Sequence, residues 1–207
     1  MIRRAALTAS LGILFLGLLA QRLQTVDPGQ VFQAMGQVGP LPWALAVLAT
    51  WVSFRAVAGY DLTLHRHLVT GVAPARARLA GLAAIAIAQT VGMGVVSGAL
   101  VRWRMMPELG LWGAMRLSVA VALSFLLAWA VLAAVVLLVW PIPALAGVPW
   151  LVLGAAVVAL GAGLAFRRAW CPNLITVARL LALAAVDCLA AGLALWLLLP
   201  GDLAFVA

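Results

Sequence analysis

The sequence predicts an all-α, polytopic integral membrane protein with no soluble domain of its own. Hydrophobic residues fill 67% of its 207 positions, only 9% are charged, and the mean hydropathy is +1.21. A soluble domain of this length needs far more charge to cover its surface, so the bilayer is the expected solvent. The charges gather in short clusters between long apolar runs, which is typical of membrane helices joined by short loops.

The chain is strongly basic, with a net charge of +8 that comes from thirteen arginines, without any lysine, against five acidic residues. Most of these arginines lie at the ends of apolar runs, and no basic stretch with interleaved aromatic residues lies outside them. Orientation in the membrane and contact with anionic phospholipids therefore explain the charge better than nucleic acid does. We expect membrane phospholipids as partners and no nucleic acid.

Six apolar segments are expected, most of them close to the roughly 20 residues that cross ~30 Å of hydrocarbon. They are Ala5–Ala20, Pro42–Gly59, Leu79–Val101, Leu117–Trp140, Val148–Phe166 and Leu180–Leu199. The first segment follows two arginines, as in a signal peptide, but its cleavage site is poor, so we favour an uncleaved helix. The connections are short and rich in proline and glycine, at residues 27–29, 39–42, 141–143 and 200–201. None can hold a domain, so residues 1–207 are expected to form a single transmembrane domain.

The arginines also predict the topology. If all six segments crossed the membrane from a cytoplasmic N-terminus, the arginines at 102–116 and at 167–179 would lie outside, against the positive-inside rule. If the third segment enters and leaves on the same side, every arginine cluster lies inside and only Arg22 lies outside. We therefore expect a bacterial inner-membrane protein with five full crossings, one re-entrant segment and a cytoplasmic N-terminus.

The composition of the third segment favours the same interpretation. It begins as an Ala/Ile-rich helix and then changes to the run 89–98, QTVGMGVVSG, where three glycines weaken a helix. Irregular backbone at membrane depth persists only where it is buried in protein or lines a wet cavity. The alternative is a straight helix that packs through Gly94 and Gly98 as a GxxxG face.

No motif for catalysis or metal binding is found in the sequence. The nucleotide-binding GxxxxGK[ST], the hydrolase GxSxG and the metalloprotease HExxH patterns are all missing. Cys171 and Cys188 lack a CxxC spacing, and His65 and His67 stand two apart with no further ligand near, which favours a solvated loop. We expect no cofactor, no metal and no enzyme activity.

Three stretches resemble the lysylphosphatidylglycerol synthase/flippase transmembrane family. The run Val91–Arg104, VGMGVVSGALVRWR, resembles that family's LGFGxLSGGAVRYR signature. Gly59-Tyr60-Asp61, followed by Arg66, is similar to its GYD…LR element, and Leu180–Pro200, with Asp187, is similar to its LLLSLLDWLLAALVLYxLLP helix. The stretches stand in the family's order and span most of the chain. It departs from the family at its SNN triplet, which reads Ala88-Gln89-Thr90, and at Ala99, Trp103 and Cys188.

The resemblance implies a function in lipid transport. In that family the membrane part is thought to move aminoacylated phosphatidylglycerol between leaflets, and a cytosolic domain attaches the amino acid from aminoacyl-tRNA. The 207 residues contain neither the family's SHVPGG motif nor that transferase domain, so the resemblance covers about the first half of the flippase unit. It implies a lipid-translocating module, or half of one, that acts on anionic or aminoacylated phosphatidylglycerol. The alternative is a non-transporting scaffold or interaction subunit that a second polypeptide or a second copy completes.

The candidates for contact with a lipid headgroup come from these stretches. They are Asp61, Arg66, Gln89, Gly92, Ser97, Gly98, Arg102, Arg104 and Asp187. An ionised Asp187 inside the sixth segment costs roughly 2.5–3.5 kcal/mol to insert, so it needs a partner. That partner is a cationic headgroup or, alternatively, an arginine such as Arg55 or Arg102, unless the carboxyl is protonated.

The other charged candidates have similar alternatives. Asp61 contacts a headgroup or simply pairs with Arg66. Arg102 and Arg104 point in different directions on a continuing helix, so one of them is expected to bind a lipid phosphate while the other faces the headgroup layer. Interfacial snorkelling is the alternative for both arginines.

Overall fold

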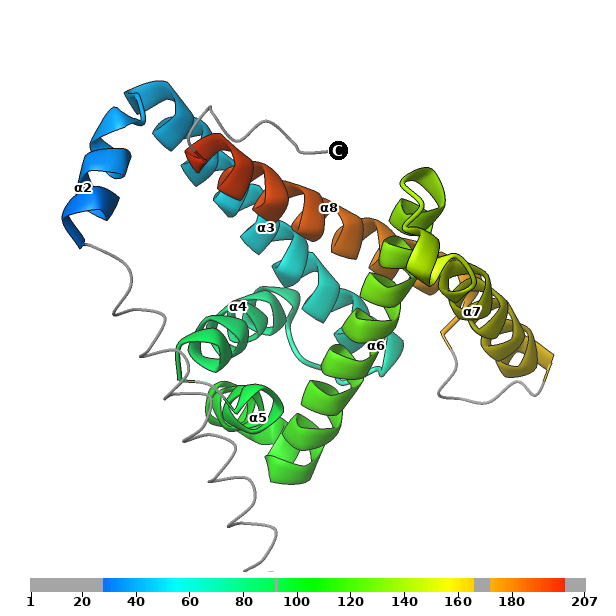
Figure 1. Cartoon of the computed structure of the whole chain (residues 1–207). Helices are drawn as coiled ribbons and strands as arrows, with labels where there is room; N and C mark the ends of the chain where they lie inside the picture. Colours follow the sequence, from blue (N-terminus) through cyan, green and yellow to red (C-terminus); the bar gives the residue numbers. More distant parts are fainter. Residues whose placement is uncertain (1–27, 92, 166–171, 200–207) are drawn as a thin grey trace, which may run out of the picture. The chain divides into compact units, whose positions relative to one another are not determined.

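A computed structural model describes residues 28–91, 93–165 and 172–199, and all regular secondary structure in these ranges is helical (Figure 1). The helices are α2 (Pro28–Gln37), α3 (Pro40–His67), α4 (Pro74–Val91), α5 (Gly94–Met105), α6 (Gly110–Val139), α7 (Val148–Ala165) and α8 (Leu174–Leu198). Two 3-10 turns, η1 (Pro107–Leu109) and η2 (Pro143–Leu145), precede α6 and α7. The all-α fold class is confirmed for these ranges, whereas the first predicted segment lies outside them.

Three helical stretches are long and apolar enough to cross a membrane: Pro40–His67, Pro107–Val139 and Leu174–Leu198. They correspond to the second, fourth and sixth predicted segments. The fifth predicted segment corresponds to α7, where the apolar stretch Pro143–Ala159 is shorter than those three. The third predicted segment is divided between α4 and α5. The chain also falls into two compact units, and residues 47–194 form one of them.

Several helices begin at a proline, so the observed loops are shorter than the predicted ones. α2 begins at Pro28, α3 at Pro40 and α4 at Pro74. A proline in the first turn costs little, because the N–H that it lacks has no partner inside the helix there. The loops predicted at 27–29 and 39–42 are therefore wrong over Pro28–Gly29 and Pro40–Pro42, which are helical.

α3 continues eight residues beyond its predicted end at Gly59. The extra turns carry polar side chains, and the hydroxyl of Thr63 donates to the carbonyl of Gly59 at 2.8 Å, within the helix. Val69, with a φ of 48°, lies in the turn that follows α3. His65 is buried rather than part of a solvated loop, so that prediction is wrong.

α4 and α5 form a helical hairpin, and the straight-helix alternative for the third segment is therefore wrong. The chain turns at Met93, which has left-handed backbone angles (φ 55°, ψ 18°). Beyond the turn the two helices pack closely, because a Cβ added to Gly98 would lie 3.8 Å from the carbonyl oxygen of Ala84. At the open end, Arg76 of α4 forms a 2.8 Å ion pair with Glu108 of η1, just after α5.

The core of this unit forms where α3, α4, α6 and α8 meet. Its buried members are Tyr60, Leu64, Ala80, Met106, Leu117, Val121, Ala128, Leu180 and Ala184. Tyr60 of α3 packs edge-to-face on Phe125 of α6, with ring centroids 5.6 Å apart. α8 contacts α3 closely, because a Cβ on Gly59 would lie 3.2 Å from the Leu183 side chain.

Candidate functional site

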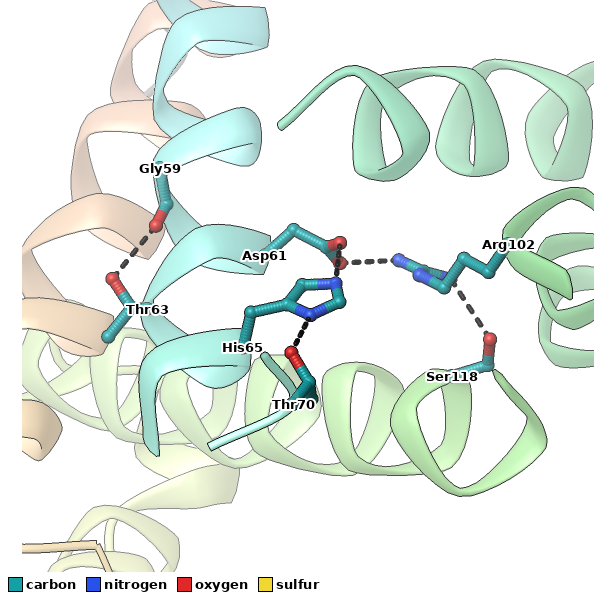
Figure 2. Close-up of polar contacts among 7 residues, drawn as sticks. All are labelled: Gly59, Asp61, Thr63, His65, Thr70, Arg102 and Ser118. Carbon is teal, nitrogen blue, oxygen red and sulfur yellow. Dashed lines mark hydrogen bonds and ion pairs between the residues drawn. The ribbon is translucent and has the colours of Figure 1, made fainter. Parts of the chain in front are cut away.

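Four polar side chains from three helices form a buried group, called here the Asp61–Arg102 cluster (Figure 2). Asp61 and His65 lie on α3, Arg102 on α5 and Ser118 on α6. Asp61 is 0% exposed, and Arg102 is only 3% exposed. Ionisable side chains are almost never buried this fully unless they are paired, so Asp61 and Arg102 are expected to have partners inside the fold.

One guanidinium joins all three helices. Nη2 of Arg102 donates to Oδ1 of Asp61 at 2.5 Å, and Nη1 of the same side chain donates to the Ser118 hydroxyl at 3.0 Å. Hydrogen bonds between ionised groups are shorter and stronger than neutral ones, and an arginine can make several in a fixed geometry. Arg102 therefore holds α5 against both α3 and α6.

His65 lies one helical turn beyond Asp61. Its Nε2 is 3.6 Å from Oδ2 of Asp61, which is too far for a hydrogen bond, while Nδ1 lies 2.7 Å from the Thr70 hydroxyl (Figure 2). Within the described residues, neither Oδ2 of Asp61 nor Nε2 of His65 has a hydrogen-bond partner. The imidazole thus extends the cluster towards the turn after α3, but it makes no hydrogen bond to Asp61.

A glycine of α4 makes the close approach to Asp61 possible. A Cβ on Gly81 would lie 2.6 Å from both Cβ and Cγ of Asp61, so only a hydrogen fits there. Three alanines of the same helix, Ala77, Ala80 and Ala84, are also 0% exposed. Sequence reasoning missed Gly81, although the spacing of small residues along α4 is typical of a close helix contact.

The observed pairing corrects two predictions. Asp61 does not pair with Arg66, which is exposed, but with Arg102 from another helix. Arg102 does not pair with Asp187, because its guanidinium binds Asp61. The first prediction failed because it used sequence neighbours, whereas the partner lies 41 positions away.

Asp187 lies apart from this cluster, half-buried near the middle of α8. Its carboxylate accepts a hydrogen bond from the Ser53 hydroxyl of α3. Among the described side chains, none of the ion pairs involves Asp187, and Arg55 lies instead over the Trp51 ring, 5.5 Å from its centroid. The predicted pairing of Asp187 with Arg55 or Arg102 is therefore wrong.

The remaining candidates do not converge on one site. Gln89 and Arg104 are exposed, and Gly92 lies outside the described residues. Ser97 is buried, and its hydroxyl donates to the carbonyl of Gly94 at 3.3 Å. Gly98 does border the cluster, because its added Cβ would lie 3.2 Å from Nη1 of Arg102. The structure thus brings together Asp61, Gly98 and Arg102.

In the parts of the chain that the structure describes, no three His, Cys, Asp or Glu side chains gather in a way that could hold a metal ion. The chain matches no family model, no curated protein and no solved structure among those compared with it. The family resemblance of its three sequence stretches therefore stays a prediction.

Proposed function

We propose that this chain is a lipid-translocating module of the bacterial inner membrane, or half of one, that moves aminoacylated or anionic phosphatidylglycerol between leaflets. The observation that carries the proposal is the environment of Asp187. This carboxylate lies within a helix long and apolar enough to cross a membrane, and its one hydrogen-bond partner in the described residues is the neutral Ser53 hydroxyl. An aminoacylated headgroup brings an ammonium group, which is the counter-charge that an ionised Asp187 needs.

The contrast with Asp61 supports this assignment. Asp61 is fully buried and neutralised by Arg102, so its charge is used inside the fold. Asp187 is half-buried and has no such cation among the described residues, so its charge is open to a ligand. The proposal thus gives headgroup recognition to Asp187 and a structural role to the Asp61–Arg102 cluster.

The hairpin supports the finer topology that we propose, with five crossings, one re-entrant segment and a cytoplasmic N-terminus. Both open ends of the α4–α5 hairpin carry arginines, and Arg76 ties the start of α4 to Glu108 after α5. A hairpin whose two ends stay together is compatible with entry and exit on one membrane face. This arrangement also keeps the arginine clusters inside, as the positive-inside rule requires.

The test uses the full chain in phosphatidylglycerol vesicles that carry lysylphosphatidylglycerol in the inner leaflet only. Arrival of the lipid amine at the outer leaflet is followed with an amine-reactive reagent that does not cross the bilayer. We expect transfer with the wild-type chain, and Asp187→Asn should slow it at least about tenfold, because a charge-assisted contact is lost. Equal transfer by both proteins, each with unchanged thermal stability, would contradict the role of Asp187.

The scaffold alternative predicts a different result. With a non-transporting subunit, the lipid amine would reach the outer leaflet no faster than in protein-free vesicles, whether or not Asp187 is present. Ser53→Ala is the matched variant, since it removes the observed hydrogen bond and keeps the carboxylate. We expect Ser53→Ala to transfer lipid much better than Asp187→Asn.

A further inference from the structure

A polar pocket lies where the end of α3 meets the start of α8. Its volume is about 300 Å³, at the lower end of the roughly 300–1,000 Å³ found for small-molecule sites. The lining residues are Thr63, Arg66, His67, Asn173, Thr176 and Arg179. Neither Asp187 nor any member of the Asp61–Arg102 cluster lines it, so the pocket is a separate site.

The pocket holds two cationic side chains and no counter-charge. Arg66 comes from α3 and Arg179 from α8, and neither takes part in the ion pairs found among the described residues. The acidic residues of the described ranges are engaged elsewhere, since Asp61 binds Arg102, Glu108 binds Arg76 and Asp187 accepts from Ser53. Two guanidinium groups that line one pocket make it attractive to an anion.

Further hydrogen-bonding groups line the same pocket. Nε2 of His67 is buried and has no hydrogen-bond partner in the ranges that the structure describes. Asn173 opens α8, where its Oδ1 accepts from the backbone N–H of Thr176 at 2.8 Å. The first turn of this 25-residue helix also carries a partial positive charge, which adds to the attraction for an anion.

We propose that this pocket binds a phosphate group, with Arg66 and Arg179 as its charged ligands and His67 as an additional donor. A phosphate presents more acceptor oxygens than a carboxylate does, so it can satisfy donors that reach it from two different helices. Guanidinium forks match its oxygens in pairs. The group belongs to a phospholipid headgroup or to a soluble phosphate compound.

Ordinary snorkelling does not account for this arrangement. A snorkelling arginine extends on its own from a helix end into the headgroup layer. Here arginines from two helices line one cavity together with a histidine whose ring nitrogen is buried. The proposal does not depend on lipid translocation, because a scaffold subunit could bind phosphate in the same pocket.

The experiment is native mass spectrometry of the full chain, released from an uncharged detergent in the presence of phosphatidylglycerol or of inorganic phosphate. The pocket variant is Arg66→Gln/Arg179→Gln, and the control is Arg78→Gln/Arg116→Gln, which removes the same charge from two exposed arginines outside the pocket. We expect the pocket variant to raise the apparent Kd of the phosphate-bearing ligand at least about tenfold, since two charged contacts are lost. The control variant should stay within about twofold of the wild type.

The two ligands distinguish the source of the phosphate. Loss of one bound phosphatidylglycerol from the pocket variant alone would identify a lipid headgroup, and loss of bound inorganic phosphate alone would identify a soluble compound. Equal binding by all three proteins, or an equal loss in both double variants, would overturn the proposal. A third variant, Arg66→Lys/Arg179→Lys, keeps the charge and loses the fork geometry, so it should bind more weakly than the wild type while its fold is unchanged.

Discussion

Asp61 and Arg102 place opposite charges in an interior that is otherwise built largely of alanine and leucine. Taking both charges out of water is unfavourable, and their attraction offsets this only when the geometry is good and further hydrogen bonds are made. Arg102 meets this condition in part, since Nη2 binds Asp61 and Nη1 binds Ser118, whereas its Nε and Oδ2 of Asp61 have no hydrogen-bond partner among the described residues. Removing one partner therefore leaves the other charge buried and unpaired, which is worse than removing both.

We expect Asp61→Asn and Arg102→Gln each to lower the free energy of unfolding by about 3–5 kcal/mol. The apolar double variant Asp61→Leu/Arg102→Met should be more stable than either single variant, because no charge is then left in the interior. Unfolding in detergent, followed by circular dichroism, measures the three values. Additive losses in the double variant would show that the two residues are not coupled.

Gly81 gives a second prediction at the scale of one residue. Its added Cβ would overlap the Asp61 side chain, so Gly81→Ala must displace the carboxylate from Arg102 or separate α4 from α3. We expect a loss of about 1–3 kcal/mol, the usual range for an overpacked interior. The control is Gly154→Ala on α7, where a Cβ meets nothing within 4 Å and helix propensity improves. Equal stability of the two variants in thermal unfolding would mean that the contact at Asp61 yields without strain.

At the scale of the elements, the α4–α5 hairpin is the feature that the sequence predicted best. The glycines and polar residues of 89–98 indicated a break, and the chain does turn at Met93, while Gly98 makes the close helix contact that the straight-helix alternative assigned to it. Both features are local, since glycine weakens a helix and admits a neighbouring backbone wherever it stands.

The polar cluster could not be predicted in the same way. It depends on which faces of α3, α5 and α6 meet, and apolar segments of similar composition carry no information about their neighbours. Polarity after Gly59 indicated a loop because exposure was assumed, whereas Asp61, Thr63 and His65 are buried. A search for small residues at helical spacing around Gly81 would have indicated that α4 approaches another backbone closely.

The hairpin leads to a prediction about Gly98. A Cβ there would lie 3.2 Å from Nη1 of Arg102 and 3.9 Å from Cβ of Ala84, so a leucine must push α5 away from α4 and disturb the ion pair. Gly98→Leu should therefore reduce the folded yield and the lipid transfer far more than Gly154→Leu, whose site is open. Monodisperse protein after detergent extraction is the measure of folded yield. Comparable yield and transfer for the two variants would remove any special role for Gly98.

At the scale of the whole chain, the distribution of charge along the helices bears on its orientation in the membrane. Exposed arginines stand close to the ends of helices at Arg66, Arg104 and Arg116, whereas the connection from Trp140 to Gly147 between α6 and α7 carries no charge. The positive-inside rule depends on this kind of asymmetry between short loops. The connection between α5 and α6 and the connection between α6 and α7 should therefore lie on opposite sides of the bilayer, with α6 crossing between them.

This orientation can be tested by cysteine labelling at the two ends of α6. Trp112 and Gly147 are both exposed, so cysteines there should react wherever the reagent has access, once Cys171 and Cys188 are replaced by serine. With a re-entrant hairpin and a cytoplasmic N-terminus, Gly147→Cys should react with an impermeant maleimide in spheroplasts. Trp112→Cys should react only after the membrane is permeabilised. The reverse pattern would contradict the proposed topology, and it would place the arginines around Arg104 and Arg116 outside, against the rule from which the topology was inferred.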